Sequence, residues 1–131
     1  MPPTLYSVAV FVTDMDRALL FYRDHLGLPL LRQGAFGAEF LDGETRLGVH
    51  PAVHADAKVL VGRHTGVTLH VPDLLSYCER LHDRGVRFLT EPTRQAFGIM
   101  ALVADPDGNV FALWEADGRS DEVEETEGRD V

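Results

Sequence analysis

The chain carries the same pattern of strands and helix twice, and this repeat limits its possible folds more than any other feature. A Val-x-Asp sequence occurs at Val12–Asp14 and again at Val71–Asp73, 59 residues apart. In each copy it follows an alternating apolar segment, which predicts a strand, and precedes an apolar stripe at helical spacing. The aspartate is a suitable N-cap and a glycine ends each stripe, so helices are predicted over 14–26 and 73–84.

Three short apolar segments follow each helix, so each half of the chain has the order βαβββ. The segments are 28–33, 36–41, 45–50, 86–90, 99–104 and 109–115. A unit of about 50 residues with one helix leaves one face of its sheet open and is marginal alone, so two units must associate. We predict an α+β fold in which two tandem βαβββ modules form a curved, cup-shaped sheet with the helices outside.

The expected boundaries follow from this pattern and from the charge. We predict a single domain over 1–116, with modules at about 4–50 and 66–116 and a connector over 51–65. The chain has 131 residues and a net charge of −9, and more than half of that charge lies in residues 117–131, which are predicted to form an acidic, disordered tail. Such an excess of acidic groups disfavours nucleic acid and anionic membranes as partners.

The sequence also indicates a compartment. The single cysteine, Cys78, has no internal partner for a disulfide, and its place on the second helical stripe predicts an inert core thiol. No export signal is visible, and no uncharged apolar run approaches the ~18 residues of a membrane span. We therefore expect a cytoplasmic protein.

Two segments of the chain resemble a known family. They are Phe21-Tyr22-Arg23-Asp24-His25-Leu26-Gly27-Leu28 and Asp105-Pro106-Asp107-Gly108-Asn109. Together they resemble the vicinal oxygen chelate superfamily, which contains glyoxalase I, bleomycin-resistance proteins, fosfomycin-resistance enzymes and extradiol dioxygenases. The likeness spans about residues 4–116 and implies the same fold and a homodimer. Asp105 and Asp107 are predicted to bond backbone amides of their turn rather than to act as an acid pair.

The resemblance also implies four metal-ligand positions, one on the first and one on the last strand of each module. In this sequence they are Ser7, Gly48, Gly66 and Ala112. None is His, Glu or Gln, and glycine and alanine side chains have no donor atoms, so we predict no metal and no cofactor there. A displaced metal site formed by His50, His54, Asp56 and His64 is an alternative, although its spacing matches no metal motif.

Strand alternation selects the residues that face the predicted cup. Its candidate ligand-binding residues are Phe11, Arg46, His50, Thr68, His70 and Trp114. Flat aromatic area beside polar groups suits an organic ligand. The alternatives are core or dimer packing for Phe11 and Trp114, a structural hydrogen-bonded role for His70, and a solvent-exposed strand end for His50.

These observations favour a binding protein over an enzyme without deciding between them. The leading hypothesis is that the protein binds a small organic molecule, such as an antibiotic or a metabolite, without a metal, as the resemblance to bleomycin-resistance proteins implies. One alternative is a metal-dependent lyase or dioxygenase, like glyoxalase I, with nonstandard ligands. Another is an interaction or regulatory subunit without a ligand.

Overall fold

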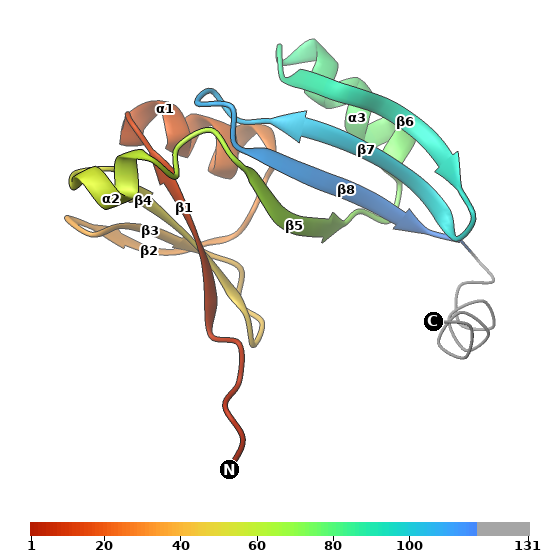
Figure 1. The fold of residues 1–131 in the computed structure, drawn as a ribbon. Coiled ribbons are helices and arrows are strands. Elements are labelled where there is room, and N and C mark those ends of the chain that lie inside the picture. The colour runs from red at the N-terminus through yellow and green to blue at the C-terminus, as the bar shows by residue number, and fades with distance from the viewer. Residues whose placement is uncertain (118–131) are drawn as a thin grey trace. The chain divides into compact units, whose positions relative to one another are not determined.

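The computed structural model describes residues 1–117, and the chain divides into two compact units. Among the described residues, the first unit comprises Met1–Thr65 and Ala104–Val110, and the second comprises Gly66–Val103 and residues 111–117. A four-stranded sheet lies in each unit, accompanied by a helix (Figure 1). The predicted α+β fold with two βαβββ repeats is therefore confirmed.

The first sheet has the strand order β1-β4-β3-β2, with β1 parallel to β4 and the other pairs antiparallel. Its elements are β1 (Ser7–Val12), α1 (Met15–Leu19), the π-helical segment η1 (Leu20–His25), β2 (Leu30–Gly34), β3 (Gly37–Phe40) and β4 (Arg46–Pro51), followed by the short helix α2 (Ala55–Lys58). Asp14 caps α1 as predicted, because its side chain accepts a hydrogen bond from the Arg17 amide. The α-helix predicted to continue to Leu26 changes instead to π-helical geometry, in which the Leu26 amide donates to the Phe21 carbonyl.

The core of the first unit lies between this helix and one face of the sheet. On that face Val10, Leu47 and Phe40 are buried, and the ring of Phe40 lies 5.9 Å from that of Tyr22 on η1. The alternate residues of β1, which include Phe11, point to the other face and are more exposed. The predicted alternation of β1 is therefore confirmed, and the second face of this sheet is left for the candidate site.

A buried carboxylate holds the turn before β8 (Val110–Ala116) within the first unit. Asp105 Oδ1 accepts from the amides of Asp107 and Asn109 at 2.9 and 2.8 Å, which confirms the predicted turn-forming role for Asp105. For Asp107 the prediction was wrong, because its carboxylate accepts from the amide and hydroxyl of Thr13 and pairs with Arg17 instead. Asp105 Oδ2 accepts from the Tyr22 hydroxyl at 2.6 Å and from the Asn109 side chain at 2.9 Å. Burial, and next the charge of Asp105, raises the pKa of Tyr22, so that the phenol stays protonated and donates.

Asn109 connects this turn to β1 and to the segment before β5 (His64–His70). Its Nδ2 also donates to the Phe11 carbonyl, and its Oδ1 accepts from the amides of Gly62 and Arg63. Asn109 is fully buried, and each of its polar side-chain atoms has a partner. The turn therefore also fixes the edge of β1, the strand that carries Phe11.

The second sheet has the strand order β5-β8-β7-β6, in which β6 spans Arg87–Gln95 and β7 spans Gly98–Ala104. This sheet packs against α3 (Leu74–Asp83) (Figure 1). Asp73 caps α3 as predicted, since its side chain accepts from the Ser76 amide. Glu115 on β8 adds a second acceptor, for the Leu74 amide at 2.8 Å. Cys78 is 2% exposed, and burial raises its pKa to about 11, as expected for a core thiol.

A repeated Ala-Phe-Gly sequence, at Ala35–Gly37 and Ala96–Gly98, marks corresponding hairpins in the two units. Both glycines have positive φ, 122° and 155°. A Cβ atom on Gly37 would collide with the Val49 carbonyl oxygen, and one on Gly98 with that of Glu115. Only glycine fits where the hairpin passes so close to the last strand, and the sequence analysis missed this repeat.

The predicted tail, 117–131, lies outside the described residues except for its first member. The Asp117 amide donates a hydrogen bond to the Phe97 carbonyl, and the Asp117 carboxylate pairs with Arg94 at 3.3 Å.

No helix within residues 1–117 is both long and apolar enough to cross a membrane.

The Asp105 network predicts a stability cost for Tyr22→Phe. The substitution removes one of four donors to a buried carboxylate, so we expect the free energy of unfolding to fall by about 1.5–3 kcal/mol in urea titrations. Tyr6→Phe is the matched control, because Tyr6 is 55% exposed, and we expect a change below about 0.5 kcal/mol there. Equal effects of the two substitutions would show that the buried network contributes little.

The hairpin geometry predicts a larger cost for Gly37→Ala. The added methyl meets the β4 backbone, which cannot move without disturbing the sheet, so we expect a loss of at least about 3 kcal/mol or failure to fold. Gly43→Ala, where no atom lies within 4 Å of a Cβ, should unfold within about 1 kcal/mol of the parent protein. Thermal unfolding followed by circular dichroism compares the two.

Candidate functional site

The helix-free face of the first sheet has a floor of small residues. Ala9 on β1 lies in register with Gly48 on β4, and Gly48 in turn faces Glu39 on β3. Two larger side chains, Arg46 and His50, flank Gly48 along β4 on the same face. The face therefore offers a small floor between a guanidinium and an imidazole.

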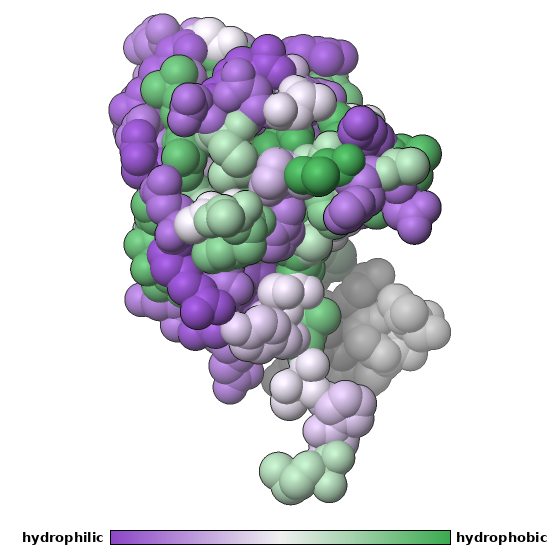
Figure 2. All heavy atoms as spheres, turned by 90° about the vertical axis from the view of Figure 1, so that its left-hand side faces the viewer, coloured by the Kyte–Doolittle hydropathy of each residue, from purple (hydrophilic) through white to green (hydrophobic). Residues whose placement is uncertain are grey.

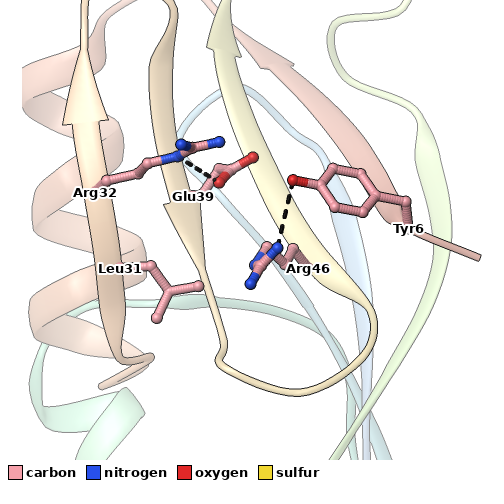
Figure 3. Close-up of a pocket in the computed structure, with 5 residues that line it drawn as sticks. All are labelled: Tyr6, Leu31, Arg32, Glu39 and Arg46. Carbon is pink, nitrogen blue, oxygen red and sulfur yellow. Dashed lines mark hydrogen bonds and ion pairs between the residues drawn. The ribbon is translucent and has the colours of Figure 1, made fainter.

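A pocket of about 180 Å³ lies at the Arg46 end of this face, and we call it the Arg46 pocket. It is lined by Tyr6, Leu31, Arg32, Glu39 and Arg46 (Figure 3). Arg46 Nη1 donates to the Tyr6 hydroxyl oxygen at 3.3 Å, and the guanidinium lies 5.5 Å from the centre of the Tyr6 ring. The phenol and the guanidinium thus hold each other in place at the mouth of the pocket.

An ion pair forms the opposite wall of the Arg46 pocket. Arg32 Nε donates to Glu39 Oε1 at 2.8 Å, and this hydrogen bond is the main cause that raises the pKa of Arg32. The Glu39 side chain is only 12% exposed, so its charge depends on Arg32 for compensation. An irregular register between Leu30 and Arg32 places Arg32 opposite Glu39.

At the other end of the face, His50 is fixed by a backbone contact. Its Nδ1 lies 2.8 Å from the Phe36 carbonyl oxygen, so Nδ1 carries a hydrogen and donates it to that oxygen. A Cβ on Gly48 would lie 2.6 Å from Nε2, which means that the imidazole covers the glycine. The rings of Phe11 and Phe36 lie 6.0 and 6.3 Å from the imidazole.

In the second unit, two predicted residues come together. The His70 ring lies 5.8 Å from Trp114 in an edge-on arrangement, and the Val71 amide donates to the Trp114 carbonyl at 2.7 Å. Thr68 lies two residues before His70 on β5, and both are exposed. The structure therefore pairs Phe11 with His50 and His70 with Trp114, and it places Arg46 in the pocket with Tyr6.

Sequence reasoning missed several residues of the site. Tyr6, Arg32, Glu39 and Phe36 were not among the candidates. A polar Glu39 between the buried Ala38 and Phe40 was a usable signal, because an isolated charge in an apolar strand needs a partner across the hairpin. The contact between Phe36 and His50 had no such signal, since it uses a loop carbonyl.

The four positions that the resemblance assigns to metal ligands do not fit a metal ion. Ser7, Gly48, Gly66 and Ala112 together supply a single hydroxyl group, whereas a divalent ion needs several donors at fixed geometry. Across residues 1–117, no group of three or more His, Cys, Asp or Glu side chains is arranged to hold a metal. The displaced cluster around His50 and His54 is therefore not formed.

Comparison with known proteins defines the family. Residues 4–113 match the Glyoxalase/Bleomycin resistance protein/Dioxygenase superfamily, and the chain belongs to this superfamily. A probable lactoylglutathione lyase from a Synechocystis species is 31% identical over 129 residues, which cover 89% of this chain and 98% of the relative. The resemblance drawn from the sequence is thereby confirmed.

Two solved structures are similar as well. UcmS2 has a TM-score of 0.75 and 26% identity, covering 87% of this chain and 98% of its own. TnmS3, an antibiotic binding protein from Streptomyces sp. CB03234, has a TM-score of 0.68 and 26% identity, covering 88% of this chain and 98% of its own. The proteins that this chain resembles thus include one named for binding and one named for catalysis.

The position of His50 predicts a coupling with residue 48. Gly48→Ala should destabilise the protein by about 1–2 kcal/mol, because the methyl displaces the imidazole from the Phe36 carbonyl. In a His50→Ala background the same change should be neutral or slightly stabilising, since alanine suits a strand better than glycine. A double-mutant cycle in urea measures the coupling, and additive effects would contradict the geometry.

Proposed function

We propose that this protein binds a small organic molecule, such as an antibiotic or another metabolite, without a metal ion and without transforming it. The observation that carries the proposal is the set of small residues at the metal-ligand positions, with His50 covering Gly48. Lewis-acid chemistry at those positions requires donors that these side chains lack. The similarity to TnmS3, named as an antibiotic binding protein, supports the same class of function.

The proposed ligand contacts are those that alternation selected from the sequence. They are Phe11, Arg46, His50, Thr68, His70 and Trp114. The aromatic rings provide flat area for stacking, and the His50 imidazole provides a polar atom in Nε2. A ligand with an aromatic portion and a polar group matches this combination.

One observation favours a second candidate, a metal-dependent lyase. The Synechocystis relative, 31% identical, is named as a probable lactoylglutathione lyase. For this chain to share that activity, donors other than the four small residues would have to hold the ion. Elemental analysis of the purified protein, and turnover of the methylglyoxal–glutathione adduct with added Ni²⁺ or Zn²⁺, test this candidate.

Two further parts of the proposal rest on the sequence. The resemblance implies a homodimer, which sedimentation of the full chain would measure. The single cysteine favours a reducing compartment such as the cytoplasm.

The proposed function predicts ligand binding that a chelator does not affect. Trp114 is the only tryptophan, so its fluorescence reports directly on β8 during titration with a panel of aromatic antibiotics. We expect saturable quenching by at least one compound and the same affinity in EDTA. His70→Ala should weaken that affinity about tenfold, the effect of losing one good polar contact.

The matched control is His54→Ala, since His54 is exposed and its side chain does not cap α2. Its affinity should equal that of the parent protein. Binding or turnover that EDTA abolishes would overturn the metal-free proposal in favour of the lyase. A lack of response to every compound would favour the alternative of an interaction subunit without a ligand.

A further inference from the structure

Arg46 is a cation without a compensating carboxylate. Its guanidinium contacts the Tyr6 hydroxyl and ring, and it forms no ion pair with any side chain in the described part of the chain. Its Nε is buried and has no hydrogen-bond partner there. A buried donor on a charged group costs free energy unless an acceptor reaches it, so Arg46 keeps donor capacity that no described residue uses.

The other charges around the pocket do not supply that acceptor. Glu39 is already bonded to Arg32 at 2.8 Å, so this pair is neutral as a unit. The Arg46 pocket therefore keeps one positive charge in a chain of net charge −9. Among residues 1–117, Arg63 Nε is also buried without a hydrogen-bond partner, but Arg63 does not line the pocket, and its Nη2 donates to the Ala9 carbonyl.

The hydroxyl group of Tyr6 is a second donor beside Arg46, and it too suits a ligand that accepts hydrogen bonds. Tyr6 accepts a hydrogen bond from Arg46, which leaves the phenol hydrogen to be donated, and no acceptor for it occurs among residues 1–117. Figure 3 shows Tyr6 and Arg46 side by side, with Leu31 as an apolar wall below the ion pair. Two donors beside an apolar wall suit a carboxylate attached to a hydrocarbon or aromatic group.

We propose that the Arg46 pocket binds the carboxylate of an organic acid, with Arg46 and Tyr6 as donors and Leu31 against the apolar part. This inference rests on the proposed function and names a chemical class for its ligand. A volume of about 180 Å³ accommodates a carboxylate with a few carbon atoms, so the rest of a larger ligand extends out of the pocket along the helix-free face of the sheet. A neutral carbonyl group in the same place could accept a hydrogen bond but would leave the positive charge of Arg46 uncompensated, and a cationic group would be repelled.

The mixed character of the surrounding surface fits a small ligand rather than a large apolar partner. On the face drawn in Figure 2, hydrophobic side chains lie in scattered groups among hydrophilic ones. Within the Arg46 pocket the exposed hydrophobic side chains are Tyr6 and Leu31, 55% and 39% exposed, and they share the lining with the charged Arg32, Glu39 and Arg46. A lining of this mixed kind suits a small ligand.

The test uses benzoate, an aromatic carboxylate, and benzamide, a neutral compound of nearly the same shape. The full ¹⁵N-labelled chain is titrated with each at constant ionic strength while the arginine Nε–H signals are followed by NMR. The Arg46 signal is assigned by its loss in Arg46→Gln. We expect this signal to shift saturably with benzoate and to shift much less with benzamide, whose carbonyl accepts a hydrogen bond but carries no charge.

Variants assign the effect to the pocket. Arg46→Gln should weaken benzoate binding by about tenfold or more in calorimetry, and Arg46→Lys, which keeps the charge, should weaken it less. Arg87→Gln, which removes an exposed arginine from β6, is the matched control and should leave the affinity unchanged. If Arg46→Gln does not fold, Tyr6→Phe replaces it and should weaken binding a fewfold.

The outcomes separate this inference from the proposed function. Equal shifts with benzoate and benzamide, or a benzoate affinity that the Arg46 and Tyr6 variants leave unchanged, overturn the carboxylate site. If a compound that bears a carboxylate binds but Arg46→Gln does not change its affinity, the proposed function stands and the carboxylate site fails. If benzoate binding depends on Arg46 but no larger compound binds, the carboxylate site stands and the proposal of an antibiotic as the ligand fails.

Discussion

The first unit depends on one buried carboxylate. Asp105 is 3% exposed and accepts four hydrogen bonds, two from backbone amides and one each from Tyr22 and Asn109. A buried charge is tolerated only when hydrogen-bond donors replace the water that would otherwise solvate it. The turn that contains Asp105, the π-helical segment η1 and the edge of β1 must therefore keep their relative positions. Because Asn109 also binds the Phe11 carbonyl, the same network fixes the strand that contributes Phe11 to the candidate site.

Local patterns predicted the elements well, and long-range contacts explain what they missed. Alternation and capping aspartates placed β1, α1 and α3 correctly, since both signals lie within a few residues. The bond between Tyr22 and Asp105 joins residues 83 positions apart, and no local signal announces it. The π-helical turn after α1 was missed for a related reason, because it depends on how the buried aromatics of η1 pack in the core.

In the candidate site, too, local patterns predicted some features, and others depend on long-range contacts. Alternation predicted that Arg46 and His50 share a face with Gly48, and the register of β1 and β4 agrees. The orientation of His50 depends on the Phe36 carbonyl, in a loop whose path follows from the positive φ of Gly37. The Arg46 pocket needs the irregular register of β2, which brings Arg32 opposite Glu39. Bulges and loop carbonyls are set by tertiary packing, so sequence periodicity does not report them.

Small residues at the metal-ligand positions change where recognition can take place. A glycine at position 48 removes a donor from the sheet floor and also makes room, which the His50 imidazole takes. The polar groups that remain stand beside the floor, as His50 at one end and Arg46 at the other. Their roles differ, because His50 Nδ1 is already bonded to the Phe36 carbonyl, whereas Arg46 keeps a charged donor that has no partner among the described residues. In a chain of net charge −9, attraction of an anion must come from such short-range contacts, since the long-range field opposes its approach. Selectivity at this face therefore depends on hydrogen-bond geometry at close range more than on overall charge.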